Sequence, residues 1–262
     1  MQPQVMGIVN ITPDSFSDGG KTFQHEAALR HALLLVEEGA SILDIGGESS
    51  RPGASPVSVQ EELDRVIPFI EKLKQESAVR LSVDTSKPEV MRAALDLSVW
   101  MINDIYALHK PGALEAAAAS SAQVCLMHMQ GTPETMQQSP HYPRGVVPEI
   151  QNFFTAQLQR CEKAGIAKER LWLDPGFGFG KTLNHNLALL KHIKALKVEG
   201  RPLVVGVSRK SLLGEIIHQP IDKRLYAGLA VAAFVGLQGI QVIRTHAVRP
   251  TCELLKVLEA IT

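Results

Sequence analysis

Short apolar runs recur along the chain, and most of them stop at a polar or charged residue. The runs are rich in β-branched residues and are bounded by turn-forming residues, a pattern typical of buried parallel strands. Eight runs have this form, and they centre on residues 7–9, 42–45, 81–83, 100–102, 124–127, 171–173, 204–207 and 242–243. Because the carboxyl ends of parallel strands lie on one face, we expect the polar residues that end these runs to meet at a single mouth.

Between the runs, apolar residues three and four positions apart predict helices. The clearest helical patterns cover residues 26–38, 60–76, 88–97, 147–164, 187–197, 223–237 and 251–258. Eight β–α alternations, with no interruption long enough for a second domain, predict a single (β/α)8 TIM barrel over residues 1–262, with its active site at the C-terminal ends of the strands. A doubly wound sheet is the alternative, which the lack of an antiparallel edge strand disfavours.

The composition narrows the class of protein. Of the 262 residues, 45% are hydrophobic, enough for a sizeable core. Lys plus Arg balances Asp plus Glu at 27 each, so no global field favours nucleic acid or an acidic membrane. The three cysteines, an odd number in no metal-binding spacing, indicate free thiols in a reducing compartment. No leader-like or membrane-spanning run is visible, and we expect a soluble, cytoplasmic protein.

Asp84, Asn103 and Asp174 each follow one of the predicted strands. A residue in this position often caps the next helix, and capping stays an alternative for any one of them. Three such groups at three strand ends point to a ligand, because carboxylates accept paired N–H donors while an amide both donates and accepts. The set suits the amino-pyrimidinone edge of a flat heterocycle.

Cationic residues follow the seventh and eighth runs. Lys210 comes just past the seventh run, where an inward role is favoured, whereas its neighbour Arg209 fits a solvated turn. Arg244 and His246 follow the eighth run and precede a helix. The turns after strands 7 and 8 of such barrels commonly bind phosphate, so this pair predicts an anion site. His128 is interpreted as a hydrogen-bonded core histidine.

Two connections, residues 10–22 and 46–58, are rich in glycine, proline and small polar residues. They also carry Phe16 and Arg51. The residue preferences of turns explain the glycines and prolines but not these two side chains, which fit a lid that closes over a substrate. The glycine-rich stretch 174–182 matches neither a Walker A motif nor a dinucleotide fingerprint. Its glycines fit a close approach of the backbone to a planar ligand, with Phe179 as an apolar wall.

Eight segments together closely resemble the dihydropteroate synthase family, and the resemblance covers essentially the whole chain. They are NITPDSFSDGG (10–20), DIGGESSRPG (44–53), SVDT (82–85), IND (102–104), LMHMQG (126–131), DPGFGFGK (174–181), GVSRKS (206–211) and RTH (244–246). The resemblance implies a (β/α)8 barrel, usually a homodimer, of the folate pathway. Such an enzyme joins 6-hydroxymethyl-7,8-dihydropterin pyrophosphate to 4-aminobenzoate with the help of Mg²⁺, and sulfonamides mimic the second substrate.

The resemblance also implies roles for individual residues of this chain. The pterin would be bound by Asp84, Asn103, Asp174, Lys210 and Gly206, and walled by Ile105 and Met127. The pyrophosphate would be held by Arg244, His246 and Asn10, the last through Mg²⁺. The 4-aminobenzoate would be framed by Ser50, Arg51, Pro52, Phe179 and Ser208, with Phe16 and Asp18 folding over it. Direct parts in catalysis would fall to Lys210, Arg244, His246, Asp18 and Arg51.

One departure from the family pattern is Ser50, where a threonine is usual. The hydroxyl is kept and a methyl is lost, so we expect catalysis to survive and the fit to 4-aminobenzoate and sulfonamides to shift slightly. The resemblance implies an enzyme without a covalent nucleophile, and no Cys–His or Ser–His pair stands out here, so we expect a dissociative substitution at the pterin methylene carbon. The alternatives are a methyltetrahydrofolate–corrinoid methyltransferase barrel and a catalytically silent paralogue that only binds pterin.

Overall fold

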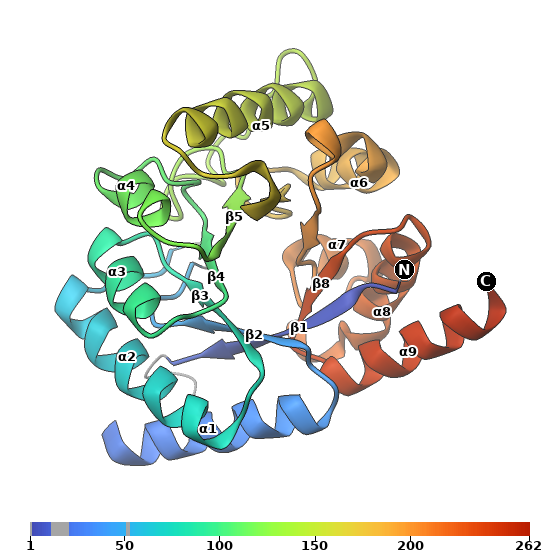
Figure 1. Ribbon diagram of the computed structural model, residues 1–262. Helices are drawn as coiled ribbons and strands as arrows, with labels where there is room; N and C mark the ends of the chain where they lie inside the picture. The colour runs from blue at the N-terminus through green and yellow to red at the C-terminus, as the bar shows by residue number, and fades with distance from the viewer. Residues whose placement is uncertain (1, 12–20, 51–52) are drawn as a thin grey trace.

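Eight parallel strands form a barrel with helices around it (Figure 1). The computed structural model describes residues 2–11, 21–50 and 53–262, and the side chains of residues 21–24 are not described. The strands are β1 (Gln4–Asn10), β2 (Ile42–Gly46), β3 (Arg80–Asp84), β4 (Met101–Asp104), β5 (Gln123–Met127), β6 (Leu171–Asp174), β7 (Val204–Val205) and β8 (Val242–Thr245). The helices are α1 (Lys21–Glu37), α2 (Val59–Glu76), α3 (Pro88–Asp96), α4 (Ala113–Ala118), α5 (Val146–Lys163), α6 (Leu183–Lys191), α7 (Ser211–Ile217), α8 (Leu225–Leu237) and α9 (Val248–Ile261).

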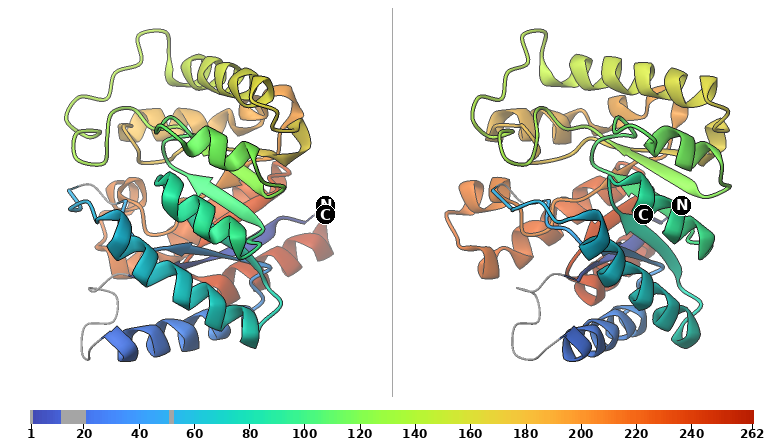
Figure 2. Two further views of the ribbon diagram at one scale, coloured as in Figure 1. Left: turned by 60° about the vertical axis from the view of Figure 1, so that its left-hand side comes forward. Right: turned by 90° about the vertical axis from the view of Figure 1, so that its left-hand side faces the viewer.

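The strand order confirms the predicted TIM barrel. Ladders run in the order β6-β5-β4-β3-β2-β1-β8-β7. The ring closes through a single parallel bridge between Leu173 and Leu203, beside a 3.0 Å hydrogen bond from the Leu173 N–H to the Pro202 carbonyl. A doubly wound sheet is therefore excluded. In the side views of Figure 2, the β2–α2 and β5–α5 connections extend from the same end of the barrel.

Some elements differ from the sequence-based expectation. Strand β7 has two residues instead of four, because a tight turn closed by a hydrogen bond from the Lys210 N–H to the Val207 carbonyl draws the chain away from the sheet. The helix expected over 187–197 is divided between α6 and a 3-10 turn over 193–196. Helix α4 is a run of six mostly alanine residues, so its sequence shows no contrast from which a periodicity could be read.

Alternation along the strands decides what fills the barrel. Strand side chains alternate between the two faces, so one set packs against the helices and the other fills the interior. The lower interior layer is apolar and consists of Met6, Ile42, Met101, Cys125, Val204 and Val242. Two residues further along four of these strands stand Asp44, Asn103, Gly206 and Arg244, and the other two strands carry Ile8 and Met127 there. The same period of two that builds the core therefore sets a polar layer above it, at the mouth.

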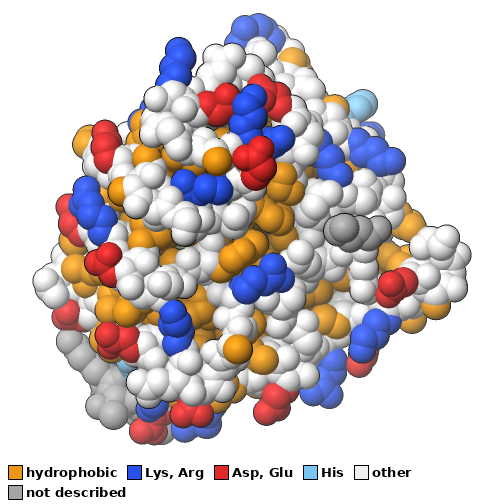
Figure 3. All heavy atoms as spheres, in the orientation of Figure 1, with side chains coloured by type: hydrophobic (Ala, Val, Ile, Leu, Met, Phe, Trp, Pro, Cys, Tyr) orange, Lys and Arg blue, Asp and Glu red, His pale blue; other side chains and the backbone are white. Residues whose placement is uncertain are grey.

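The surface agrees with the balanced composition. On the face seen in Figure 3, Lys and Arg side chains are interspersed with Asp and Glu. No helix in the described part of the chain is both long and apolar enough to cross a membrane. The cysteines Cys125, Cys161 and Cys252 are free thiols, as expected.

Gly165 and Gly176 both need a positive φ, and comparing substitutions at the two positions measures how closely the connections after β5 and β6 pack. Gly165 and Gly176 both have positive φ, but a Cβ at Gly165 meets nothing within 4 Å, whereas one at Gly176 would lie 2.0 Å from the His128 carbonyl oxygen. We expect Gly165→Ala to lower the free energy of unfolding by about 1–2 kcal/mol, the left-handed penalty alone. Gly176→Ala should cost a further ~1–3 kcal/mol because backbone must move. Urea denaturation measures both, and equal losses would contradict the packing described.

Candidate active site

A partly buried arginine, Arg244, lies at the mouth of the barrel. The Nε of Arg244, on β8, donates to Asp44 Oδ2 at 2.6 Å, and its NH2 donates to Asp84 Oδ2 at 2.9 Å. Burial alone would lower the pKa of Arg244, but the two carboxylates raise it above its ordinary value. The cation is therefore permanent, and it ties β8 to β2 and β3.

Asp44 is a residue of the site that sequence reasoning did not single out. Its carboxylate is fully buried and accepts from Ser82 Oγ at 2.6 Å and from Asn103 Nδ2 at 3.1 Å, in addition to Arg244. Asp44 lies in the middle of a strand instead of at its end, so the rule that polar residues end the strands passes over it. The signal that could have found it is the alternation Ile42, Asp44, which puts a carboxylate on the interior face.

Asp84 and Asn103 lie side by side, paired in register between β3 and β4. Burial raises the pKa of Asp84 to about 7, with help from the like charge of Asp44 and against the effect of Arg244. Asn103 is buried, and its Oδ1 has no hydrogen-bond partner in the described part of the chain. The helix after Asp84 is capped at Lys87 without a side-chain bond, so capping does not explain Asp84.

Asp174 ends β6, two strands beyond β4 in the ring. It is buried, and burial raises its pKa while Lys210 opposes the shift. Its Oδ1 also accepts from the Gly176 N–H at 2.7 Å, so the residue shapes its own turn while facing the mouth. The turn role and the ligand role considered for Asp174 are thus compatible.

Lys210 points inward as expected. Its Nζ donates to the Phe177 carbonyl at 2.5 Å and lies 4.8 Å from the centroid of the Phe179 ring. Burial lowers the pKa of Lys210 to about 8, although Asp174 acts in the opposite sense. Arg209 is exposed, in agreement with its interpretation as part of a solvated turn.

A second buried lysine, Lys181, supports this wall and was missed from sequence. Its Nζ donates to the carbonyls of Gly176 at 2.8 Å and Phe179 at 2.9 Å, and lies 3.0 Å from His128 Nδ1. Burial, followed by the charge of Lys181, lowers the pKa of His128 to about 2, so the imidazole is neutral and its Nδ1 can accept from Lys181 Nζ. The prediction that His128 is a hydrogen-bonded core residue is confirmed.

Ser208 and His246 form the other end of the mouth. Ser208 Oγ accepts from the His246 backbone N–H at 3.2 Å and lies 3.1 Å from His246 Nδ1. These residues, 38 positions apart in sequence, meet because β7 and β8 are neighbours, so no local pattern of the sequence shows their contact. Both residues, with Arg244, border a cavity of about 290 Å³ that continues toward α8. Gly206 lies against Arg244, where a Cβ would approach that side chain to 3.6 Å.

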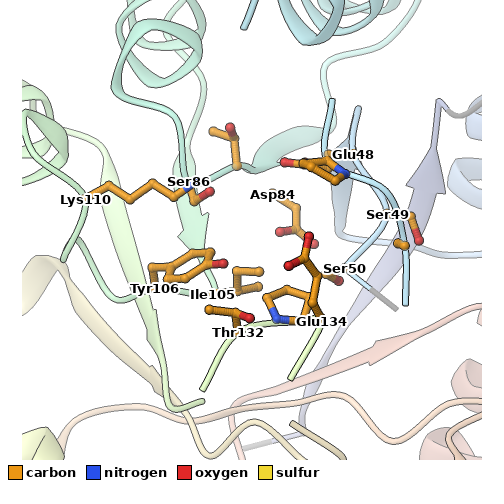
Figure 4. Close-up of a pocket in the computed structure, with 14 residues that line it drawn as sticks. Glu48, Ser49, Ser50, Asp84, Ser86, Ile105, Tyr106, Lys110, Thr132 and Glu134 are labelled. Carbon is orange, nitrogen blue, oxygen red and sulfur yellow. The ribbon is translucent and has the colours of Figure 1, made fainter. Parts of the chain in front are cut away.

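A second cavity, of about 190 Å³, opens beside Asp84 (Figure 4). It is lined by Glu48, Ser49, Ser50, Ala54, Pro56, Asp84, Thr85, Ser86, Ile105, Tyr106, Lys110, Thr132, Pro133 and Glu134. The structure thus brings Ser50, Ile105 and Asp84 together, while Met127 is buried at the end of β5 and Asn10 ends β1. Four further residues of the sequence-based site, Phe16, Asp18, Arg51 and Pro52, lie outside the described residues.

Known proteins share both the sequence and the fold. The family model for pterin binding enzymes matches residues 6–246. The dihydropteroate synthase of Escherichia coli strain K12 is 52% identical over 98% of this chain and 91% of its own length. A Yersinia pestis dihydropteroate synthase in a sulfonamide drug complex superimposes with a TM-score of 0.94, at 51% identity over 99% of this chain and 94% of that one. The enzyme from Xanthomonas albilineans with 7,8-dihydropteroate gives 0.90, at 46% identity over 99% and 94%.

The raised pKa of Asp84 predicts that this residue opposes folding at neutral pH. A carboxyl group with a folded pKa of about 7 and an ordinary value of 3.8 binds more protons in the folded state, so it lowers stability progressively as pH rises from about 4 to about 7. We expect Asp84→Asn to raise the thermal midpoint of the ligand-free protein at pH 8, and to do so less at pH 5. The exposed Asp96→Asn, at the end of α3, is the control. A gain that is larger at pH 5 than at pH 8 would contradict the shift.

Proposed function

The chain belongs to the pterin-binding enzymes and, within them, to the dihydropteroate synthases. We propose that it joins 6-hydroxymethyl-7,8-dihydropterin pyrophosphate to 4-aminobenzoate, forming 7,8-dihydropteroate and pyrophosphate. The observation that carries this proposal is the polar layer above the apolar barrel core. Two buried carboxylates, Asp44 and Asp174, the partly buried Asp84 and a buried amide, Asn103, stand there on strands that the barrel holds apart, and Arg244 bonds two of the carboxylates.

The pterin edge matches this layer chemically. Its amino and ring N–H groups are donors, which Asp84 and Asp174 accept, and the buried Asn103 Oδ1 offers a further acceptor. Lys210 supplies a donor from the opposite wall. Arg244 donates two hydrogen bonds, to Asp44 and Asp84, and so forms the floor of the site. It also borders the anion cavity.

The pyrophosphate fits the cavity bordered by Ser208, Arg244 and His246. The hydroxyl of Ser208 accepts a backbone N–H, which suits it for positioning and leaves its own proton for an anion oxygen. A serine nucleophile has no task here, because the leaving group already departs from a methylene carbon that the electron-rich pterin stabilises as a cation. Positioning and electrostatic stabilisation then carry the rate.

Mg²⁺ would neutralise charge on the departing pyrophosphate. The described residues hold no group of three His, Cys, Asp or Glu that could bind a metal by themselves. That agrees with an ion carried mainly by phosphate oxygens and waters, as Mg²⁺ commonly is, with Asn10 as the protein ligand. The amide oxygen of Asn10, at the end of β1, is a suitable hard donor at the edge of the mouth.

The outer face of α8 supports a homodimer. Tyr226 is 81% exposed, Leu237 55% and Phe234 40%, on a helix with apolar residues all round. Such a face is stabilised when a second copy covers it. Sedimentation of the purified protein tests the dimer, and a single monomeric species at micromolar concentration would refute it. We also infer that the enzyme acts in the cytoplasm, where its pyrophosphate substrate would be retained.

The direct test of the activity uses purified protein, the pterin pyrophosphate, Mg²⁺ and labelled 4-aminobenzoate. We expect labelled dihydropteroate to form, and EDTA to suppress its formation. Pterin binding without product would favour the silent paralogue. The methyltransferase alternative is disfavoured by the comparisons and by the Ser208–His246 end of the mouth, for which it has no use.

Asp174→Asn tests the pterin edge. The substitution keeps the size of the side chain and removes a charge-assisted pair with the pterin N–H groups. We expect pterin binding to weaken by ~1.5–3 kcal/mol, measured by calorimetry, while the exposed Asp96→Asn leaves it unchanged. An affinity equal to that of the wild type would remove Asp174 from the pterin site.

A further inference from the structure

The connection between β2 and α2 is closed on itself by one carboxylate. Glu48 Oε1 accepts a hydrogen bond from the Val57 N–H at 2.9 Å, so the start and the end of the connection are joined. Ser49 and Ser50 follow Glu48 directly and line the cavity beside Asp84 (Figure 4). The placement of these serines therefore depends on how Glu48 is held.

Lys87 holds Glu48 from below. Its Nζ contacts Glu48 Oε2 at 2.7 Å and also bonds Glu62 Oε2 on α2. Glu62 is fully buried, and its Oε1 has no partner in the part of the chain that the structure describes. Lys87 is itself the residue that precedes α3, three positions after Asp84. One ammonium thus joins the connection to α2 and to the start of α3.

We expect the Glu48–Lys87–Glu62 network to contribute little net stability to the fold. Removing two carboxylates and an ammonium from water costs several kcal/mol, and apolar residues of the same volume are often as stabilising. The first residues of the connection also have other support, since Arg65 NH1 donates to the Gly47 carbonyl at 2.7 Å and a Cβ at Gly47 would lie 2.7 Å from Val66 Cγ2. What the ion pairs add is the position of Glu48 and of the serines after it.

We propose that Lys87 is a positioning residue for 4-aminobenzoate, acting through Glu48 on the serines of the β2–α2 connection. The proposal rests on the proposed function. The ammonium touches neither Asp84 nor Asp174, and the pterin layer is held by strands and by Arg244. Loss of the Lys87–Glu48 contact should consequently affect the second substrate and spare the first.

The double variant Lys87→Met with Glu62→Leu, and the single variant Glu48→Ala, remove the Lys87–Glu48 contact without leaving a buried charge unpaired. Lys87→Met alone would leave Glu62 charged and buried without a partner, whereas Lys87→Met with Glu62→Leu replaces the buried pair by apolar groups. Glu48→Ala cuts the same link from the other side and buries no new charge. Lys87→Arg keeps a cation for both carboxylates and should restore most of the function. Lys74→Met is the matched control, because Lys74 also ties α2 to the α3 region, at Leu97, but far from the site.

The experiment measures KM for 4-aminobenzoate and, separately, Kd for the pterin pyrophosphate by calorimetry. We expect the double variant and Glu48→Ala to raise KM roughly tenfold, the loss of about one charge-assisted hydrogen bond, with the pterin Kd and the control unchanged. A folded variant with unchanged KM, or with KM and pterin Kd rising together, would overturn the proposal. If the wild type forms no dihydropteroate, the proposed function itself fails, and binding of labelled 4-aminobenzoate to the pterin-loaded protein still tests the role of Lys87.

Discussion

The guanidinium of Arg244 between Asp44 and Asp84 is the interaction on which the mouth of the barrel depends. The two carboxylates stand on neighbouring strands, where like charges at close range repel each other. Arg244 reaches them from β8 at 2.6 and 2.9 Å, and so joins three strands across the mouth. With that cation in place, Ser82 and Asn103 can be fixed around Asp44, and Asp84 is left facing the ligand.

Two ionisable groups at the mouth, Asp84 and Lys210, have pKa values close to neutral pH. The pKa of Asp84 is raised to about 7 and that of Lys210 is lowered to about 8, each chiefly by burial. Two groups of opposite sign that titrate near neutral pH can change protonation when a ligand brings its own donors and acceptors. N–H donors that a ligand brought to Asp84 would favour the ionised carboxylate that burial disfavours.

Sequence reasoning reached the barrel and the residues at the strand ends because both depend on local patterns. Strand number, strand direction and the placing of Asp84, Asn103 and Asp174 follow from apolar runs and from where those runs stop. The Glu48–Lys87–Glu62 network and the partners of Asp44 were beyond it, because these contacts join residues far apart in sequence. Arg244 and Asp44, for example, are 200 positions apart, and no local pattern announces their contact.

The proposed sites for the two substrates lie on different parts of the barrel, one on the strands and the other on the β2–α2 connection. On the proposed assignment, the pterin would meet interior positions of the strands, next to the barrel core. The 4-aminobenzoate would meet a connection outside the ladders that is tied by Glu48 and Lys87. A connection of this kind tolerates substitution more readily than a strand. The physical expectation is that the fit to the second substrate can be tuned by single residues such as Ser50 more readily than the pterin contacts can.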